Sequence, residues 1–110
     1  MKMFRDALRG IILSVRIERN IRTHTLVAFT VIVVGVLLQL NMGIILIVIS
    51  SVLSSEMLNT CIEAICDLVH PDKSDAIRNI KDIAAGAVLI NVIVSVLVGV
   101  YLILNQKIYK

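Results

Sequence analysis

IAAGAVLINVIVSVLVGVYLIL, residues 83–104, is long and apolar enough to decide the class of the protein. Asn91 and Ser95 are its polar interruptions, and a transmembrane helix needs about 20 mainly apolar residues. In lipid such a segment must satisfy its own backbone hydrogen bonds, and the sequence lacks the alternating pattern of a membrane barrel. The stretch therefore predicts a membrane-spanning α-helix.

The remainder of the chain agrees with a membrane protein. Of its 110 residues 58% are hydrophobic, and the mean hydropathy is +0.95, which is far from the composition of an average soluble domain. Two further apolar runs cover residues 26–40, extendable to 23–41, and residues 42–66. We expect an all-α integral membrane protein with three transmembrane helices, which forms a single domain over residues 1–110.

The first residues of the chain follow a different pattern. Apolar side chains recur at helical spacing, while charged side chains fill the other side of the same helix. The apolar set is Met1, Phe4, Leu8, Ile11, Ile12 and Val15, and the charged set is Lys2, Arg5, Asp6, Arg9 and Arg16. The pattern predicts an amphipathic helix that lies in the inner membrane interface with its cations toward lipid phosphates. A simple anchor and a direct part in a site both remain open.

The basic residues indicate how the chain is oriented in the membrane. Of eleven Lys and Arg, six precede the first span, three lie between the second and third spans, and two follow the third. In order they are Lys2, Arg5, Arg9, Arg16, Arg19 and Arg22, then Lys73, Arg78 and Lys81, then Lys107 and Lys110. The positive-inside rule places the N-terminus in the cytoplasm and the C-terminus outside. The sequence has no motif for nucleic-acid binding, and we expect none.

Polar side chains interrupt the second span at helical intervals. They are Glu56, Asn59, Glu63 and Asp67, called the polar stripe below. Their spacings of three, four and four residues place them on one face of a helix with about 3.6 residues per turn. Ionisable groups within membrane segments are rare and mark functional sites. Counting from an outer end near Met42, Glu63 lies near the inner interface and Glu56 about 10 Å deeper.

This order of depth suits two chemical tasks. A carboxylate near Glu63 can meet water, a divalent cation and a soluble phosphate donor, whereas Glu56 can meet the head group of a lipid. Mg²⁺ prefers oxygen ligands and is often held by one or two carboxylates together with substrate phosphates. In phosphoryl transfer a carboxylate can take the proton of the attacking hydroxyl. Neither GxxxxGK[ST] nor GxGxxG occurs, so a soluble type of nucleotide-binding fold is not indicated.

Two other interpretations use the same side chains. One is a structural polar seam between helices or subunits, satisfied by the serines at 50, 51, 54 and 55 and by Asn91. The other is a path for protons or cations through a small conducting oligomer. Residue types alone do not separate such a path from a kinase site.

Two segments of the chain resemble the signature of a known family. They are EMLNTCIEAICDLV at 56–69 and KDIAAGAVLI at 81–90. A Glu-x-Asn-x-Arg-x-His pattern extends the match toward the N-terminus, together with Phe4 and Gly10; its members are Glu18, Asn20, Arg22 and His24. The sequence is similar to the small prokaryotic diacylglycerol kinase family, which includes the undecaprenol kinases of Gram-positive bacteria.

The resemblance implies a fold, an assembly and a reaction. The fold is a surface helix with three transmembrane helices in the bacterial inner membrane. The assembly is a homotrimer whose active sites are shared between neighbouring subunits at the cytoplasmic face. The reaction transfers the γ-phosphoryl group of Mg-ATP to the hydroxyl of a membrane lipid.

The matching positions also imply roles for single residues. Glu56 is implied to be the general base toward the lipid hydroxyl, and Glu63 is implied to bind Mg²⁺ together with Glu18. Asn59 is implied to orient groups between these two carboxylates, and Asp67 is implied to hold the cytoplasmic end of the site. Lys81 and Asp82 are implied to contact the ATP phosphates.

The acceptor follows from two shorter elements. The Glu-x-Asn-x-Arg-x-His pattern and Asn-Thr-x-Ile-Glu at 59–63 resemble the Gram-positive branch, which implies undecaprenol as the acceptor. Diacylglycerol is the alternative acceptor, and a small ion- or proton-conducting oligomer is the alternative outside enzymes.

Overall fold

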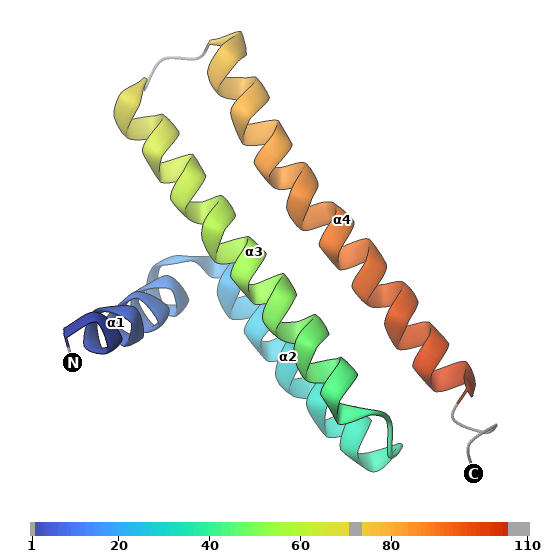
Figure 1. Cartoon of the computed structure of the whole chain (residues 1–110). Helices are drawn as coiled ribbons and strands as arrows, with labels where there is room; N and C mark the ends of the chain where they lie inside the picture. Colours follow the sequence, from blue (N-terminus) through green and yellow to red (C-terminus); the bar gives the residue numbers. More distant parts are fainter. Residues whose placement is uncertain (1, 71–73, 106–110) are drawn as a thin grey trace.

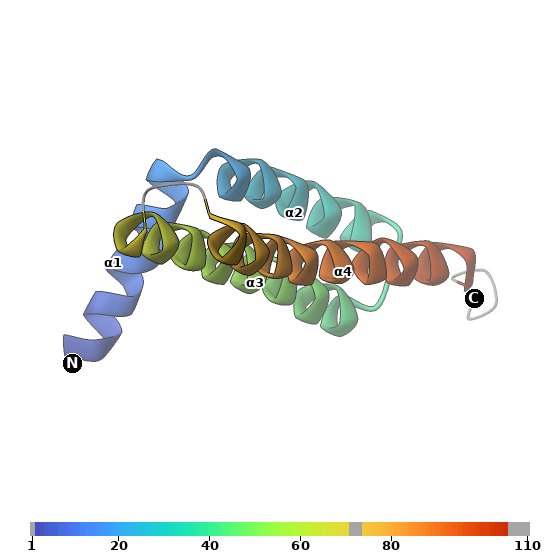
Figure 2. The same ribbon diagram turned by 90° about the horizontal axis from the view of Figure 1, so that it is seen from above.

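The computed structural model describes residues 2–70 and 74–105. Met1, the segment 71–73 with Lys73, and the segment 106–110 with Lys107 and Lys110 lie outside the described residues. The described chain forms the helices α1 (Lys2–Ile17), α2 (Arg19–Leu37), α3 (Met42–Val69) and α4 (Asp75–Asn105). Contacts join α1 to α2, α2 to α3 and α3 to α4. Figures 1 and 2 show α2 and α4 beside α3, with α1 projecting away from the start of α2. The all-α prediction is confirmed.

The runs at 42–66 and 83–104 lie within α3 and α4, and the run at 26–40 lies in α2 as far as Leu37; all three helices are long and apolar enough to cross a membrane. The predicted spans are confirmed in this sense. α3 has 28 residues and α4 has 31, whereas α2 has 19. A bilayer needs about 20 residues of helix, so α3 and α4 are longer than one crossing requires. Figure 1 shows that both extend past the start of α2.

Polar residues set the helix ends that hydropathy does not mark. Ser74 directly precedes α4 and caps it, because its Oγ accepts a hydrogen bond from the Ile77 backbone N–H at 3.2 Å; Asp75 follows in the first turn. Such a capping oxygen satisfies an end donor, and an acidic residue there suits the helix dipole. Asn41 caps α3 in the same way, with Oδ1 3.2 Å from the Ile44 nitrogen. α4 therefore begins well before its apolar run at residue 83.

A break at Glu18 separates α1 from α2. Glu18 has an extended backbone conformation, with φ −108° and ψ 113°, although its N–H still donates to the Ser14 carbonyl at 3.0 Å. None of the α1 residues is buried; Phe4 and Leu8 are among its exposed apolar side chains, and Val15 is half-buried. The predicted helix is present, and its place in the membrane interface remains a prediction.

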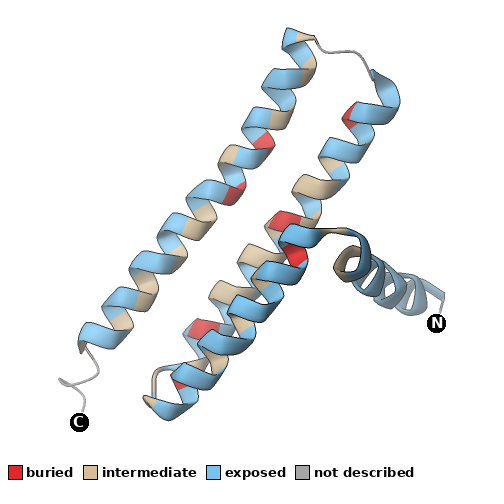
Figure 3. Ribbon diagram, turned by 180° about the vertical axis from the view of Figure 1, so that it is seen from behind, coloured by how far each residue is buried: buried red, intermediate tan, exposed pale blue. Residues whose placement is uncertain are grey.

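Close packing between α2 and α3 occurs next to the turn that joins them. Gly35 is buried there, and a Cβ atom at this position would lie 2.6 Å from Ile45 Cδ1. Elsewhere, most of the surface of the helices is open (Figure 3). Lipid or further copies of the chain must cover this apolar surface in a membrane.

A polar cluster joins α4 to α3. Asn91 Nδ2 donates to the Ser51 hydroxyl at 2.9 Å and to the Ser51 carbonyl at 3.1 Å, and it lies 3.4 Å from Ser55 Oγ. Ser95 Oγ donates to the Asn91 carbonyl at 2.7 Å. Some members of the polar seam considered as an alternative, Asn91, Ser51 and Ser55, therefore do contact one another. The partners of Asn91 are serines, and these contacts do not include the carboxylates of the polar stripe.

Asn91→Ala is expected to destabilise the protein, because it removes hydrogen bonds between helices within an apolar surrounding. The expected loss is about 0.6 kcal/mol and at most about 1.7 kcal/mol, as for other polar contacts between membrane helices. Unfolding in mixed detergent micelles with increasing SDS measures it. Ser50→Ala is the control, because Ser50 Oγ donates to the Ile47 carbonyl of its own helix. Equal stability of the two variants would refute the role of Asn91.

Candidate active site

The polar stripe lies on one unbroken helix, and its members differ in burial. Glu56 is buried, with 7% of its surface exposed, and Asn59 is half-buried. Glu63 and Asp67 are exposed. Burial therefore falls along α3 toward its C-terminal end, in the same order as the depths expected from the sequence.

Glu56 contacts a histidine on the neighbouring helix. His24 Nδ1 lies 3.2 Å from Glu56 Oε1, and the side chains are 31% and 9% exposed. His24 is five residues after Arg19, the first residue of α2, so Glu56 lies about 8 Å along the helix axis from the start of α2. Glu63 lies about 10 Å further along α3, beyond that start. Glu56 is thus enclosed by helices, and Glu63 lies where only α3 and α4 continue.

Asn59 and Glu63 are joined by a hydrogen bond. Asn59 Nδ2 donates to Glu63 Oε1 at 2.8 Å. The Asn59 Oδ1 atom is buried and finds no hydrogen-bond partner within the part of the chain that the structure describes. Buried polar atoms normally have a partner. This oxygen and the Glu63 carboxylate could therefore both contact a ligand that binds to oxygen atoms, such as a cation.

Lys81 and Asp67 form the outermost contact of the site. Lys81 Nζ donates to Asp67 Oδ1 at 2.6 Å and so joins α4 to α3. The Asp67 side chain is 66% exposed and the Lys81 side chain 37% exposed, and an ion pair this open to solvent contributes little to stability. Asp82 faces Arg78 instead, with Oδ2 3.8 Å from the guanidinium Nε. Lys81 is therefore near the polar stripe and is held only loosely.

The oxygen donors fit the chemistry of Mg²⁺. Glu18 is half-buried at the start of α2, and its side chain makes no capping hydrogen bond there. Within residues 2–70 and 74–105 no group of three or more His, Cys, Asp or Glu side chains lies close enough to hold a metal ion. Mg²⁺ needs no such group when substrate phosphates supply the other ligands. A single chain thus offers Glu63 and Asn59 together, and the structure does not join Glu18 to them.

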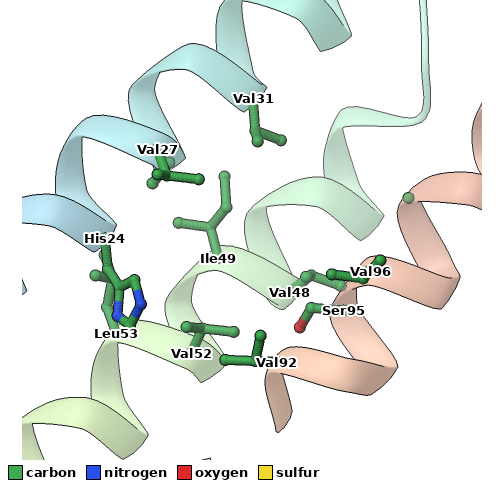
Figure 4. A pocket seen from close by; sticks show the side chains of 12 residues that line it. His24, Val27, Val31, Val48, Ile49, Val52, Leu53, Val92, Ser95 and Val96 are labelled. Carbon is green, nitrogen blue, oxygen red and sulfur yellow. The ribbon is translucent and has the colours of Figure 1, made fainter. Parts of the chain in front are cut away.

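An apolar cavity leads to the buried end of the site. It measures about 270 Å³ and lies between α2, α3 and α4 (Figure 4). Its lining is apolar apart from His24 and Ser95; the other residues are Val27, Ala28, Val31, Val48, Ile49, Val52, Leu53, Val92, Val96 and Gly99. His24 lines the cavity and also contacts Glu56, so the apolar cavity ends beside the buried carboxylate.

Sequence reasoning included His24 in a motif but gave it no role. Its contact with Glu56 depends on which faces of α2 and α3 meet, and helical spacing within one segment does not determine this. The signal in the sequence was the histidine itself, a polar residue within a predicted span.

Comparisons with known proteins identify similar chains. A family model described as "Prokaryotic diacylglycerol kinase" matches residues 5–103. An undecaprenol kinase of Bacillus subtilis is 36% identical over 108 residues, which cover 96% of this chain and 88% of the relative. A diacylglycerol kinase of Synechocystis is 36% identical over 105 residues, which cover 92% of this chain and 60% of that relative. No solved structure matches significantly.

Proposed function

The chain belongs to the prokaryotic diacylglycerol kinase family, and we propose that it phosphorylates undecaprenol in the cell membrane. It is a lipid kinase, an ATP-dependent phosphotransferase, and it forms one membrane-embedded domain in this proposal. Undecaprenol is supported by the Bacillus subtilis relative, whose match covers most of both chains. Diacylglycerol is the second candidate acceptor, because the Synechocystis relative bears that name.

The position of Glu56 is the observation that carries the proposal. A lipid alcohol has its hydroxyl at the level of the head groups and its chain among apolar side chains. His24 lines the apolar cavity and contacts Glu56, so a hydroxyl on an apolar chain that reached His24 would lie close to the Glu56 carboxylate. Glu63 lies on the open side, where a water-soluble nucleotide has access.

In the proposed reaction the hydroxyl oxygen attacks the γ-phosphorus of ATP while Glu56 accepts the hydroxyl proton. The bond from the γ-phosphorus to the β–γ bridging oxygen breaks, and ADP leaves. Glu63, Asn59 and Glu18 would hold Mg²⁺, which when bound neutralises charge on the β- and γ-phosphates. Lys81 would contact the phosphates, and Asp82, which faces Arg78, would lie next to it at the nucleotide. Asp67 holds Lys81 at the cytoplasmic end until the nucleotide arrives.

The proposal includes an assembly and an orientation. We place the N-terminus and the active site on the cytoplasmic side, with α1 in the interface. A homotrimer with shared sites is supported by the open apolar surface of the spans, which further copies of the chain could cover. In that assembly Glu18 and Glu63 belong to a site that neighbouring copies share.

A side-by-side assay of the two acceptors tests the proposal. The protein in vesicles receives labelled ATP with undecaprenol or with diacylglycerol at equal mole fractions. We expect undecaprenol to give a kcat/KM at least about tenfold larger, a difference that pocket contacts can supply. Acetylated undecaprenol, which lacks the hydroxyl, is the control and incorporates no phosphate. A preference for diacylglycerol would move the proposal to the second candidate, and transfer to neither lipid would refute a kinase function.

A further inference from the structure

His24 occupies a position that the proposed reaction leaves unexplained. It belongs to the Glu-x-Asn-x-Arg-x-His pattern, lines the apolar cavity and lies against Glu56. Glu56 is the one acidic side chain of the described chain that is buried. Figure 4 shows His24 among the side chains that line the cavity, and its contact with Glu56 joins α2 to α3 there.

The geometry is that of a donor close to its acceptor without full alignment. His24 Nδ1 is buried and forms no well-aligned hydrogen bond, although Glu56 Oε1 is 3.2 Å away. A buried nitrogen without a partner is unfavourable, so the ring gains by turning its N–H toward the carboxylate. Hydrogen bonds of active sites are often loose before the substrate binds and tighten in its complex.

Resting on the proposed function, we propose that His24 is a positioning residue for the base. Its Nδ1–H donates to Glu56 Oε1 and holds the carboxylate at the end of the cavity, so that Oε2 is free to take the proton of the lipid hydroxyl. His24 takes no part in the proton transfer itself. This role explains why a histidine stands at the boundary between apolar side chains and a buried carboxylate.

Two substitutions separate the roles of the ring nitrogens. In His24→Asn the amide nitrogen lies where Nδ1 was, and no atom replaces Nε2. His24→Leu fills the space and removes both nitrogens. We expect His24→Leu to lower kcat about 10²-fold, because a misplaced catalytic group costs about that much, while the KM for ATP stays unchanged. We expect His24→Asn to restore at least a tenth of the wild-type kcat.

The chain supplies its own control for these variants. His70 is the other histidine of the sequence, is exposed and follows α3 outside the residues assigned to the site. His70→Gln should keep the wild-type kcat. If His24→Asn is as slow as His24→Leu, Nε2 is required and the positioning role is overturned. Wild-type turnover by His24→Leu, or an equal loss in His70→Gln, overturns it as well.

A spectroscopic measurement tests the contact without ATP or lipid. In ¹⁵N spectra of the protein in detergent micelles, Glu56→Gln should shift the ring signals of His24 and leave those of His70 in place. Unchanged His24 signals would overturn the contact. Wild-type protein that phosphorylates no lipid would refute the proposed function instead, and the spectra would still decide whether His24 and Glu56 interact.

Discussion

Glu56→Gln is expected to lower lipid phosphorylation between about 10²-fold and 10⁴-fold, the contribution of a general base. The amide has the shape of the carboxylate but cannot accept the hydroxyl proton. It also loses the negative charge that faces His24 Nδ1 at 3.2 Å. Phosphate transfer from labelled ATP to undecaprenol in vesicles measures the effect.

The loss must be separated from a loss of fold. Glu56 is buried, and its charge is costly within a membrane, so the neutral Gln should leave the stability unchanged or higher. Asp75→Asn is the matched control, because it makes the same chemical change at an exposed position in the first turn of α4. It should keep wild-type turnover. A Glu56→Gln protein that retains a tenth of the wild-type rate would show that another group is the base.

Much of the fold could be predicted because membrane spans are encoded by long apolar runs. The run at 83–104 and the two weaker runs each correspond to a helix of the structure. The ends of these helices were less evident, since Ser74 and Asn41 act through single capping contacts that hydropathy does not record. Residues 75–82 lie before the apolar run at 83–104, so hydropathy did not indicate that they belong to α4.

The polar stripe could be predicted because helical spacing fixes which side chains of one helix share a face. Glu56, Asn59, Glu63 and Asp67 indeed follow one another along α3, from buried to exposed. Contacts between helices were not predictable in this way. The pairing of Asp67 with Lys81 depends on how α3 and α4 meet, and no spacing within one segment contains that information.

In the proposed function, one helix, α3, would serve both a lipid and a nucleotide. Glu56 and Glu63 are two turns apart, about 10 Å, on the same face of α3. α2 contacts Glu56 through His24. Because α2 begins at Arg19, it does not extend along α3 as far as Glu63. The difference in length between α2 and α3 therefore creates an apolar end and an aqueous end within a single site.

Glu63→Gln is expected to lower turnover by about 10²-fold to 10³-fold, because it removes electrostatic stabilisation where charge develops on the phosphates. In the wild type, Asn59 Nδ2 donates to Glu63 Oε1 at 2.8 Å. The Gln side chain of the variant still offers an oxygen at this place, so the hydrogen bond is retained. The variant therefore tests the charge with the local hydrogen bond in place. Turnover measured over a series of Mg²⁺ concentrations reports the effect.

The Mg²⁺ series separates the two carboxylates. A weaker metal site is partly compensated by mass action, so Glu63→Gln should regain activity as Mg²⁺ rises, and Glu63→Asp should need an intermediate concentration. Glu56→Gln should gain nothing, because a missing base is not replaced by metal. Binding of Mn²⁺ to the protein with a non-hydrolysable ATP analogue, followed by electron paramagnetic resonance, should weaken in Glu63→Gln only. If Mn²⁺ affinity and the Mg²⁺ requirement of Glu63→Gln equal those of the wild type, Glu63 does not bind the metal, and its place on the aqueous side serves the nucleotide alone.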